Sequence, residues 1–471
     1  METLEKTQEE EELFRDEVST IDKEGKRIWV YPKKPSGRFH NWRIVVSVLL
    51  LAFLFLAPIL KIDGQPLLLF NIFERRFVIF GQIFWPQDFH LFVIGMIASV
   101  VFIILFTVAF GRIFCGWLCP QTIFMEMVFR KIEYWIEGDY MAQKKLKKQP
   151  WNTEKVLKKS IKHAIFMAIS FLIMHTFISY LIGFEDMLEL VQTSTAEQPG
   201  GFMAMVGFTG AFYFVFSRLR EQVCTSICPY GRFQGVMLDR NSIVVTYDHV
   251  RGEGRGKMRK GQDRQANGLG DCIDCFQCVQ VCPTGIDIRN GTQLECVNCT
   301  ACIDACDNIM DKVGMDRGLI RYASEANIAD SKPFQFTGRL KFYTGVLTIL
   351  FGGLVTLLLL RTDIETTILR TPGMLYQDQQ DNKISNLYNF KVVNKTLEQV
   401  PFEFRLEEVA GDIKMVGELL PVAGQSVGEG AMFIHLDRAD LTGMSTKIKV
   451  GIYANGEKLQ TIKTTFLGPN L

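Results

Sequence analysis

The chain has 471 residues, a net charge of +1, 48% hydrophobic residues and 22% charged residues. Its mean hydropathy of +0.12 is too apolar for a typical soluble protein, and the charged fraction is too high for a pure membrane bundle, so we expect both membrane and aqueous parts. The near-zero net charge excludes a general nucleic-acid binder, which would carry a basic excess. The 12 cysteines indicate disulfides, metal sites or both, and their spacing has to decide.

Five apolar stretches are long enough to cross a bilayer as helices, which takes about 20 residues. The expected spans are residues 43–60, 89–110, 161–182, 201–217 and 340–360. Residues 1–40 are expected to form an N-terminal tail. Its opening stretch is acidic and is expected to be disordered or marginally helical. The apolar segment 67–85 is interrupted by Glu74, Arg75 and Arg76, so we interpret it as an external interfacial piece rather than a span.

The distribution of basic residues predicts the orientation, because Lys and Arg concentrate on the cytoplasmic side of a membrane. They precede the first span and fill the loop 111–160, whereas the loop 183–200 has acidic residues and neither Lys nor Arg. The N-terminus, 111–160 and 218–339 are therefore expected inside, and everything after about 361 outside. Within this scheme, 41–239 is the transmembrane region with four spans, 240–339 an inner domain with linkers, and 340–360 the fifth span.

Eight cysteines form two runs with the spacing C-x2-C-x2-C-x3-C, at residues 272–282 and 296–306. This is the pattern of bacterial two-cluster ferredoxins, in which the fourth cysteine of each run ligates the other run's cluster. A structural zinc site is the alternative, but it does not account for the doubled spacing. The predicted ligands of one [4Fe–4S] cluster are Cys272, Cys275, Cys278 and Cys306, and those of the other are Cys282, Cys296, Cys299 and Cys302.

The other four cysteines form two matched pairs, Cys115-x3-Cys119-Pro120 and Cys224-x3-Cys228-Pro229. Each pair follows a span that leads to the inner side, which suggests an internal duplication. A spacing of four places two thiols on one helix face, and the proline sets the pair at a helix boundary. All 12 cysteines fall on the predicted inner side, which argues against disulfides. Three interpretations of the four thiols stay open: inert buried cysteines, a further iron–sulfur or tetrathiolate site, and a copper-handling or redox site.

Residues 361–471 are expected to form an external all-β domain of the immunoglobulin-like sandwich type, since apolar and polar residues alternate at period two. Asn455-Gly456 is a strong hairpin signal. This domain has no cysteine, so we interpret it as a docking or scaffolding module. The candidate strands are 387–393, 402–408, 412–416, 431–437, 446–454 and 457–466.

Two histidines lie on the third expected span. His163 and His175 are twelve residues apart, about 120° around a helix, so they would not stack on one face to form a haem pair. A polar residue at membrane depth tends to face the interior of the bundle, and we expect this of His175.

The order of these parts resembles the cytochrome c oxidase accessory protein family called CcoG, also FixG or Rdx. The ferredoxin motif is generic, and C-x3-C-P pairs also occur in related membrane ferredoxins of the NapH type; the C-terminal domain distinguishes this family. The resemblance covers nearly the whole chain. It implies a cupric reductase of the bacterial cytoplasmic (inner) membrane that supports assembly of the cbb3-type oxidase, with a cytoplasmic ferredoxin domain and a periplasmic C-terminal domain. The implied copper-handling thiols are Cys115, Cys119, Cys224 and Cys228.

The implied partners are the cbb3-type oxidase or its copper-delivery factors, membrane lipid, and an electron donor that is either a cytoplasmic protein or a quinol; nucleic acid is not expected. One alternative function is a quinol-linked, NapH-like electron-transfer subunit. Another is a non-catalytic oxidase assembly factor whose clusters sense the redox state.

Overall fold

The computed structural model describes residues 20, 21, 24, 26–193, 199–259, 264, 266–379, 382–417, 421–454 and 456–469. The acidic opening stretch that the sequence marks as a tail therefore lies outside the described residues. The chain forms two compact units. The second consists of Val355–Leu471 with the short segments Asp63–Gln65 and Gly81–Phe84, and the first contains the rest.

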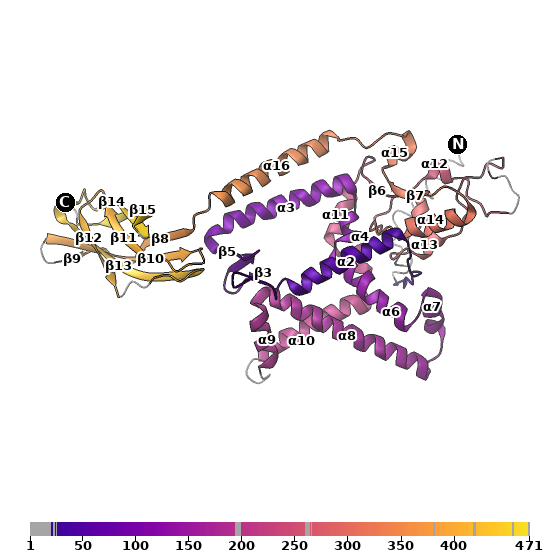
Figure 1. The fold of residues 1–471 in the computed structure, drawn as a ribbon, viewed down its shortest axis with the longest axis horizontal. Coiled ribbons are helices and arrows are strands. Elements are labelled where there is room, and N and C mark those ends of the chain that lie inside the picture. Colours follow the sequence, from indigo (N-terminus) through magenta and orange to yellow (C-terminus); the bar gives the residue numbers. More distant parts are fainter. Residues whose placement is uncertain are drawn as a thin grey trace. The chain divides into compact units, whose positions relative to one another are not determined.

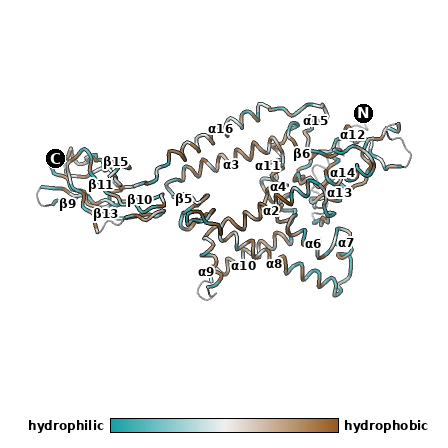
Figure 2. Tube along the Cα trace, in the orientation of Figure 1, coloured by the Kyte–Doolittle hydropathy of each residue, from teal (hydrophilic) through white to brown (hydrophobic). Residues whose placement is uncertain are grey.

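Within the described residues, five helices are long and apolar enough to cross a membrane (Figure 1). They expose most of their apolar side chains, since at most 39% of any apolar window is buried, and the hydropathy trace is correspondingly apolar along α2 and α3 (Figure 2). Such faces suit contact with lipid. The helices are α2 (Arg38–Leu56), α3 (Phe89–Phe110), α8 (Thr153–Ile182), α10 (Pro199–Phe214) with its π-helical continuation η3 (Val215–Leu219), and α16 (Gly338–Leu359).

Some of these helices continue beyond the expected apolar spans into polar residues. Thus α8 begins at Thr153, eight residues before the expected start, because the side chain of Asn152 caps it by accepting a hydrogen bond from the Lys155 amide. The expected interfacial piece 67–85 contains no long helix. It forms the short strands β3 (Leu68–Asn71), β4 (Arg76–Ile79) and β5 (Gln82–Phe84), with β3 and β4 antiparallel.

Helices α8 and α10 pack against each other around an aromatic cluster in which Phe129 and Phe216 stack with ring centroids 4.7 Å apart. His175 is buried and His163 is exposed, as their angular offset predicts, although both contact α10. The shorter helices of this unit include α4 (Ile113–Trp117), α5 (Pro120–Ile123), η2 (Phe124–Phe129), α6 (Arg130–Ile136), α7 (Tyr140–Lys148), α9 (Phe184–Gln192), η4 (Val223–Ile227) and α11 (Pro229–Met237).

The cysteine-rich part of the first unit is closed by a two-stranded antiparallel sheet. Strands β6 (Val244–Tyr247) and β7 (Ile320–Ala323) enclose α13 (Gln277–Gln280) and α14 (Ala301–Val313) between them in the chain. Its core combines aliphatic side chains with the ferredoxin cysteines themselves. The end of the expected tail is tied to this domain, because the Lys33 amide donates to the Gln280 carbonyl and Asp304 accepts from the amides at the start of α2.

The second unit is a β-sandwich, as expected. One sheet has the order β12-β13-β10-β8, with β9 also on β10, and the other has the order β11-β14-β15. All six candidate strands are present; β8 and β9 were not foreseen. Gly456 lies in the β14–β15 hairpin, and Asn455 lies outside the described residues. The strands are β8 (Ile364–Arg370), β9 (Gln377–Asp378), β10 (Lys383–Asn394), β11 (Phe402–Glu407), β12 (Gly411–Val416), β13 (Ser426–Asp437), β14 (Ser445–Ala454) and β15 (Glu457–Leu467).

Candidate functional site

The two ferredoxin loops share one unusual backbone. Asp274 and Phe276 have φ of 53° and 56°, and the matching residues Asn298 and Thr300 have φ of 53° and 64°. A left-handed conformation costs a non-glycine residue about 1–2 kcal/mol, so its repetition indicates a functional constraint. Backbone amides arranged in this way form concavities that bind anions, including iron–sulfur clusters. Each loop is therefore shaped to surround a negatively charged group.

The structure brings together the two crossed sets of cysteines. Cys306 on α14 joins the cysteines of the first loop around one cavity, and Cys282, which follows α13, joins those of the second loop around another. The exchange arises because α13 and α14 pack against each other, so Cys282 just after α13 and Cys306 on α14 each lie beside the other run's loop. One cavity is lined by Cys272, Cys275, Cys278 and Cys306, and the other by Cys282, Cys296, Cys299 and Cys302, with Cys278 at its edge.

The first cavity has a buried cation beside it. The Arg289 side chain is 4% exposed and pairs with Asp274 and Asp287 at 2.6 Å each, while its guanidinium lies 4.2 Å from the centre of the Phe276 ring. Burial raises the pKa of Cys278 to about 12, and Arg289 opposes that rise. The free thiol is thus neutral, and binding of a metal group must displace its proton.

The second cavity has no charged side chain among the described residues that line it. Its wall includes Val245, Ile286 and Val297. Burial raises the pKa of Cys296 to about 12 and that of Cys299 to about 11. The two cavities therefore offer the same donor atoms in different electrostatic surroundings.

The two C-x3-C-P pairs have matching local structures. Cys119 and Cys228 occupy the N-cap positions of α5 and α11, with backbone angles of −63°, 123° and −68°, 114°, and a proline takes the first helical position in each case. The amides of both cysteines bond to a carbonyl five residues earlier, at 2.9 and 2.7 Å. This confirms the helix boundary that the prolines predict and supports the duplication.

These pairs meet beside the second ferredoxin loop. Cys115 and Cys224 pack into one apolar cluster with Cys299 and Cys302. The contact needs a glycine, because a Cβ at Gly116 would lie 2.5 Å from the Val297 carbonyl oxygen. Cys115 and Cys224 thus lie against the second ferredoxin loop, and Cys119 and Cys228 lie near them.

The thiols of the C-x3-C-P pairs are close enough to influence one another. Burial raises the pKa of Cys115 to about 11 and that of Cys224 to about 12, and the neighbouring cysteines add to both shifts. No three His, Cys, Asp or Glu side chains converge as a single-ion site in the described parts of the chain. The sulfurs therefore share one region without meeting at a point.

Several polar residues that surround the C-x3-C-P cysteines could not be predicted from the cysteine spacing. Gln234 is fully buried and accepts a hydrogen bond from the Cys115 thiol at 3.5 Å. Arg112 donates to the carbonyls of Gly231 and Leu294, and the Nε atom of Arg43 donates to the Gly116 carbonyl at 3.0 Å. These polar groups come from distant parts of the chain. Only the closeness of Arg112 to Cys115 in the sequence could have signalled one of them.

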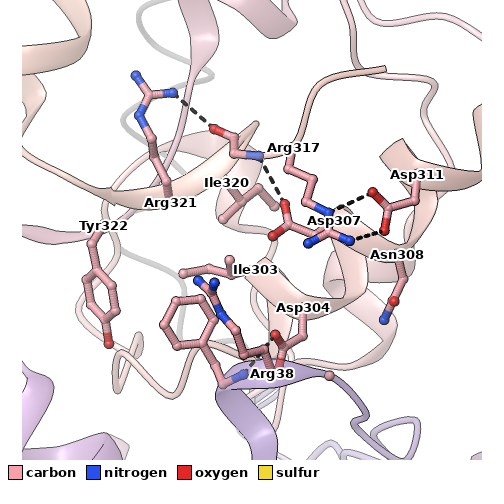
Figure 3. Close-up of a pocket in the computed structure, with 13 residues that line it drawn as sticks. Arg38, Ile303, Asp304, Asp307, Asn308, Asp311, Arg317, Ile320, Arg321 and Tyr322 are labelled. Atoms are coloured by element: carbon pink, nitrogen blue, oxygen red, sulfur yellow. Dashed lines mark hydrogen bonds and ion pairs between the residues drawn. The ribbon is translucent and has the colours of Figure 1, made fainter. Parts of the chain in front are cut away.

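A larger cavity lies on another side of α14 (Figure 3). Its charged groups have protein partners: Arg317 pairs with Asp311 at 2.7 Å, and Asp307 accepts from the Gly318 amide at 3.0 Å. Arg321, which also lines it, pairs with Asp248 at 2.6 Å. These partners give the cavity the character of a structural cleft rather than a substrate site.

Three family models match segments of the chain. Residues 219–325 match a 4Fe-4S dicluster domain, residues 92–148 match a 4Fe-4S binding domain, and residues 354–469 match the immunoglobulin-like fold at the C-terminus of FixG. A crystal structure of a FixG-related protein from Vibrio parahaemolyticus aligns with 23% of this chain and 97% of its own at 18% identity, with a TM-score of 0.20.

Three curated relatives match most of the chain. Nitrogen fixation protein FixG of Rhizobium meliloti is 35% identical, covering 86% of this chain and 83% of the relative. Protein RdxB of Cereibacter sphaeroides is 37% identical, with 79% and 80% covered. Protein RdxA of the same organism is 32% identical, with 93% and 97% covered. The chain therefore belongs to the FixG family of membrane-associated iron–sulfur electron-transfer proteins.

Proposed function

We propose that this protein reduces Cu(II) to Cu(I) at its four C-x3-C-P thiols and supplies the product for assembly of a cbb3-type cytochrome c oxidase. The observation that carries the proposal is the packing of Cys115 and Cys224 against the loop that bears Cys299 and Cys302. A metal held by those thiols would be next to an electron source.

The eight ferredoxin cysteines are the proposed ligands of two [4Fe–4S] clusters, in the crossed sets described above. When bound, the clusters would supply single electrons. The chain contributes the left-handed loops, whose amides balance negative charge, and Arg289, whose charge favours a more negative group in the first cavity. The second loop, which contacts the C-x3-C-P thiols, is the proposed exit for electrons.

The four C-x3-C-P thiols should bind the product, Cu(I), more tightly than the substrate, Cu(II). Soft sulfur ligands favour Cu(I), so binding there makes the one-electron reduction of Cu(II) more favourable. Burial keeps the free thiols of Cys115 and Cys224 protonated, because their pKa values are raised. Metal entry must therefore release protons.

The proposed setting is the bacterial inner membrane, with the ferredoxin domain cytoplasmic and the sandwich periplasmic. The basic loops on one side of the spans support this orientation. The electron donor would be a cytoplasmic protein or a quinol, and the recipients would be the oxidase or its copper-delivery factors.

Anaerobic Cu(II) reduction by the purified full-length protein tests the proposal. Cys115→Ser and Cys224→Ser should each lower the rate about tenfold or more while iron content stays constant. Ser226→Ala is the matched control, since Ser226 is exposed between Cys224 and Cys228. Parental rates in both cysteine variants would refute the copper site.

A second candidate role for the four thiols is to hold a further iron–sulfur cluster. It is favoured by the match of residues 92–148 to a 4Fe-4S binding domain, because Cys115 and Cys119 are the cysteines of that range. Iron analysis separates the two roles. Two clusters give about eight iron atoms per chain and three give about twelve; loss of about four in Cys115→Ser would favour the third cluster.

A further inference from the structure

Three cations line one small cavity near the start of helix α2. Two of them are Arg43 of α2 and Lys131 of α6, two helices of the first unit (Figure 1), and the third is Lys34, from the segment before α2. Lys34 and Lys131 are exposed, whereas Arg43 is only 4% exposed. The cavity therefore reaches the surface of the protein, and one of its three cations is buried.

The side chains of these cations have almost no partners. Among the residues that the structure describes, none of the three forms an ion pair, and Arg43 has one hydrogen bond, from its Nε atom to the Gly116 carbonyl oxygen at 3.0 Å. Partial burial lowers the pKa of Lys131, and the positive charges of Lys34 and Arg43 lower it further. The three charges are thus close enough to repel one another, and a buried charge without a counterion is costly.

Two carboxylates in the same region are bonded to other groups. Glu126 lines the cavity and pairs with Arg130 at 2.7 Å. Asp139 accepts hydrogen bonds from the backbone amides of Lys34 and Tyr140, at 2.9 and 2.8 Å. Because neither carboxylate forms an ion pair with the three cations, the surplus charge at the cavity is positive, and an anion bound there would relieve the repulsion.

The surroundings of the cavity have the character of a membrane interface. Trp42 precedes Arg43 on α2, Trp135 lies one helical turn beyond Lys131 on α6, and both indole rings are exposed. Exposed tryptophans concentrate at the level of the lipid headgroups. From Trp42 onward, α2 also exposes an apolar face that includes Leu49, and this face suits contact with acyl chains. The cavity therefore lies where the headgroup region would meet α2.

The donors define the class of anion. Guanidinium and ammonium groups both bind phosphate oxygens, and basic pockets beside membrane-spanning helices bind anionic lipid headgroups. Because Lys34 and Lys131 are exposed, a phosphate group can bind at the opening of the cavity and need not be enclosed by the protein. A lipid is favoured over a free anion because its chains can contact the exposed face of α2 while its phosphate contacts the cations.

We propose that Lys34, Arg43 and Lys131 form a binding site for the phosphate group of an anionic phospholipid. The site goes beyond the proposed function, since it involves neither copper nor the clusters. Arg43 also connects it to the rest of the protein, because its Nε atom donates to the carbonyl of Gly116, a residue inside the first C-x3-C-P pair. A bound lipid would thus be linked through one side chain to that segment.

The test measures lipid binding to the purified full-length protein in a neutral detergent. Phosphatidylglycerol, phosphatidylcholine and inorganic phosphate are titrated in separate arms, and bound lipid is counted by native mass spectrometry. We expect phosphatidylglycerol to bind more tightly than phosphatidylcholine, and inorganic phosphate to leave it in place. Lys131→Gln and Arg43→Gln should each weaken phosphatidylglycerol binding about fivefold, the contribution of one basic residue near a lipid surface.

Lys148→Gln is the matched control. Lys148 is exposed at the end of α7 and does not line the cavity, so this variant loses the same charge from the same basic loop and should keep the parental affinity. Iron content and circular dichroism report folding. If Arg43→Gln misfolds because it loses the bond to Gly116, Lys34→Gln takes its place, since Lys34 is exposed and should also contribute about fivefold.

Equal affinity for phosphatidylglycerol and phosphatidylcholine would refute the site, and so would parental affinity in the site variants. An equal loss in Lys148→Gln would reduce the effect to the general charge of the loop and also overturn the site. Displacement of the lipid by inorganic phosphate would assign the cavity to a soluble anion instead. Because no copper is added, failure of Cu(II) reduction would refute the proposed function and leave this result intact.

Discussion

The ferredoxin cysteines and the C-x3-C-P cysteines use the same thiol chemistry in two different backbones. The first set lies in loops whose left-handed residues surround a cavity. The second set lies at helix boundaries, with prolines directly after Cys119 and Cys228. The first arrangement is built around a bulky anionic group. The second leaves thiols side by side without such a cage, which suits a smaller and exchangeable ion.

The crossing of the ferredoxin ligands predicts the largest effect. Cys306→Ser should remove the cluster of the first loop, so the variant should lose about half of its iron and leave the same EPR spectrum as Cys272→Ser. Cys302→Ser should match Cys282→Ser instead. If Cys306→Ser resembled Cys302→Ser, each run would hold its own cluster and the crossed assignment would fail.

Gly116→Ala should separate the two cysteine regions. The added Cβ would collide with the backbone of Val297 and Asn298, and overpacking of this kind costs about 1–3 kcal/mol. We expect a lower thermal midpoint and slower Cu(II) reduction with iron retained. Gly207→Ala is the control, since nothing lies within 4 Å of its added Cβ; equal behaviour of the two variants would contradict the contact.

Arg289→Gln tests the electrostatic difference between the two ferredoxin cavities, and it should have the smallest effect of the three changes. Loss of the buried cation leaves Asp274 and Asp287 uncompensated, which disfavours the reduced and more negative cluster. The reduction potential of one cluster should fall by some tens of millivolts, as measured by redox titration followed by EPR. Arg317→Gln breaks the exposed pair that Arg317 makes with Asp311 of α14 and should leave both potentials unchanged.

Much of the fold was predictable because its signals are local. Apolar runs predicted all five candidate spanning helices, and period-two alternation predicted six strands of the sandwich. The ends of the helices beyond the expected spans, such as the start of α8 at Thr153, depend on a polar cap that hydropathy does not detect. The missed strand β8 (Ile364–Arg370) begins shortly after α16 ends at Leu359, and its pairing with β10 depends on a partner outside the local pattern.

The sequence by itself determined how the cysteines of this protein are grouped. Spacings of two and three residues define which cysteines share a loop, and a proline after a cysteine defines where a helix begins; both depend only on covalent geometry and neighbouring residues. The tertiary structure decided which distant residues come into contact. It brought Cys115 and Cys224 to the second ferredoxin loop and Lys131 to the cavity that Arg43 lines, because contacts between distant segments depend on how whole helices pack, and no local spacing records that.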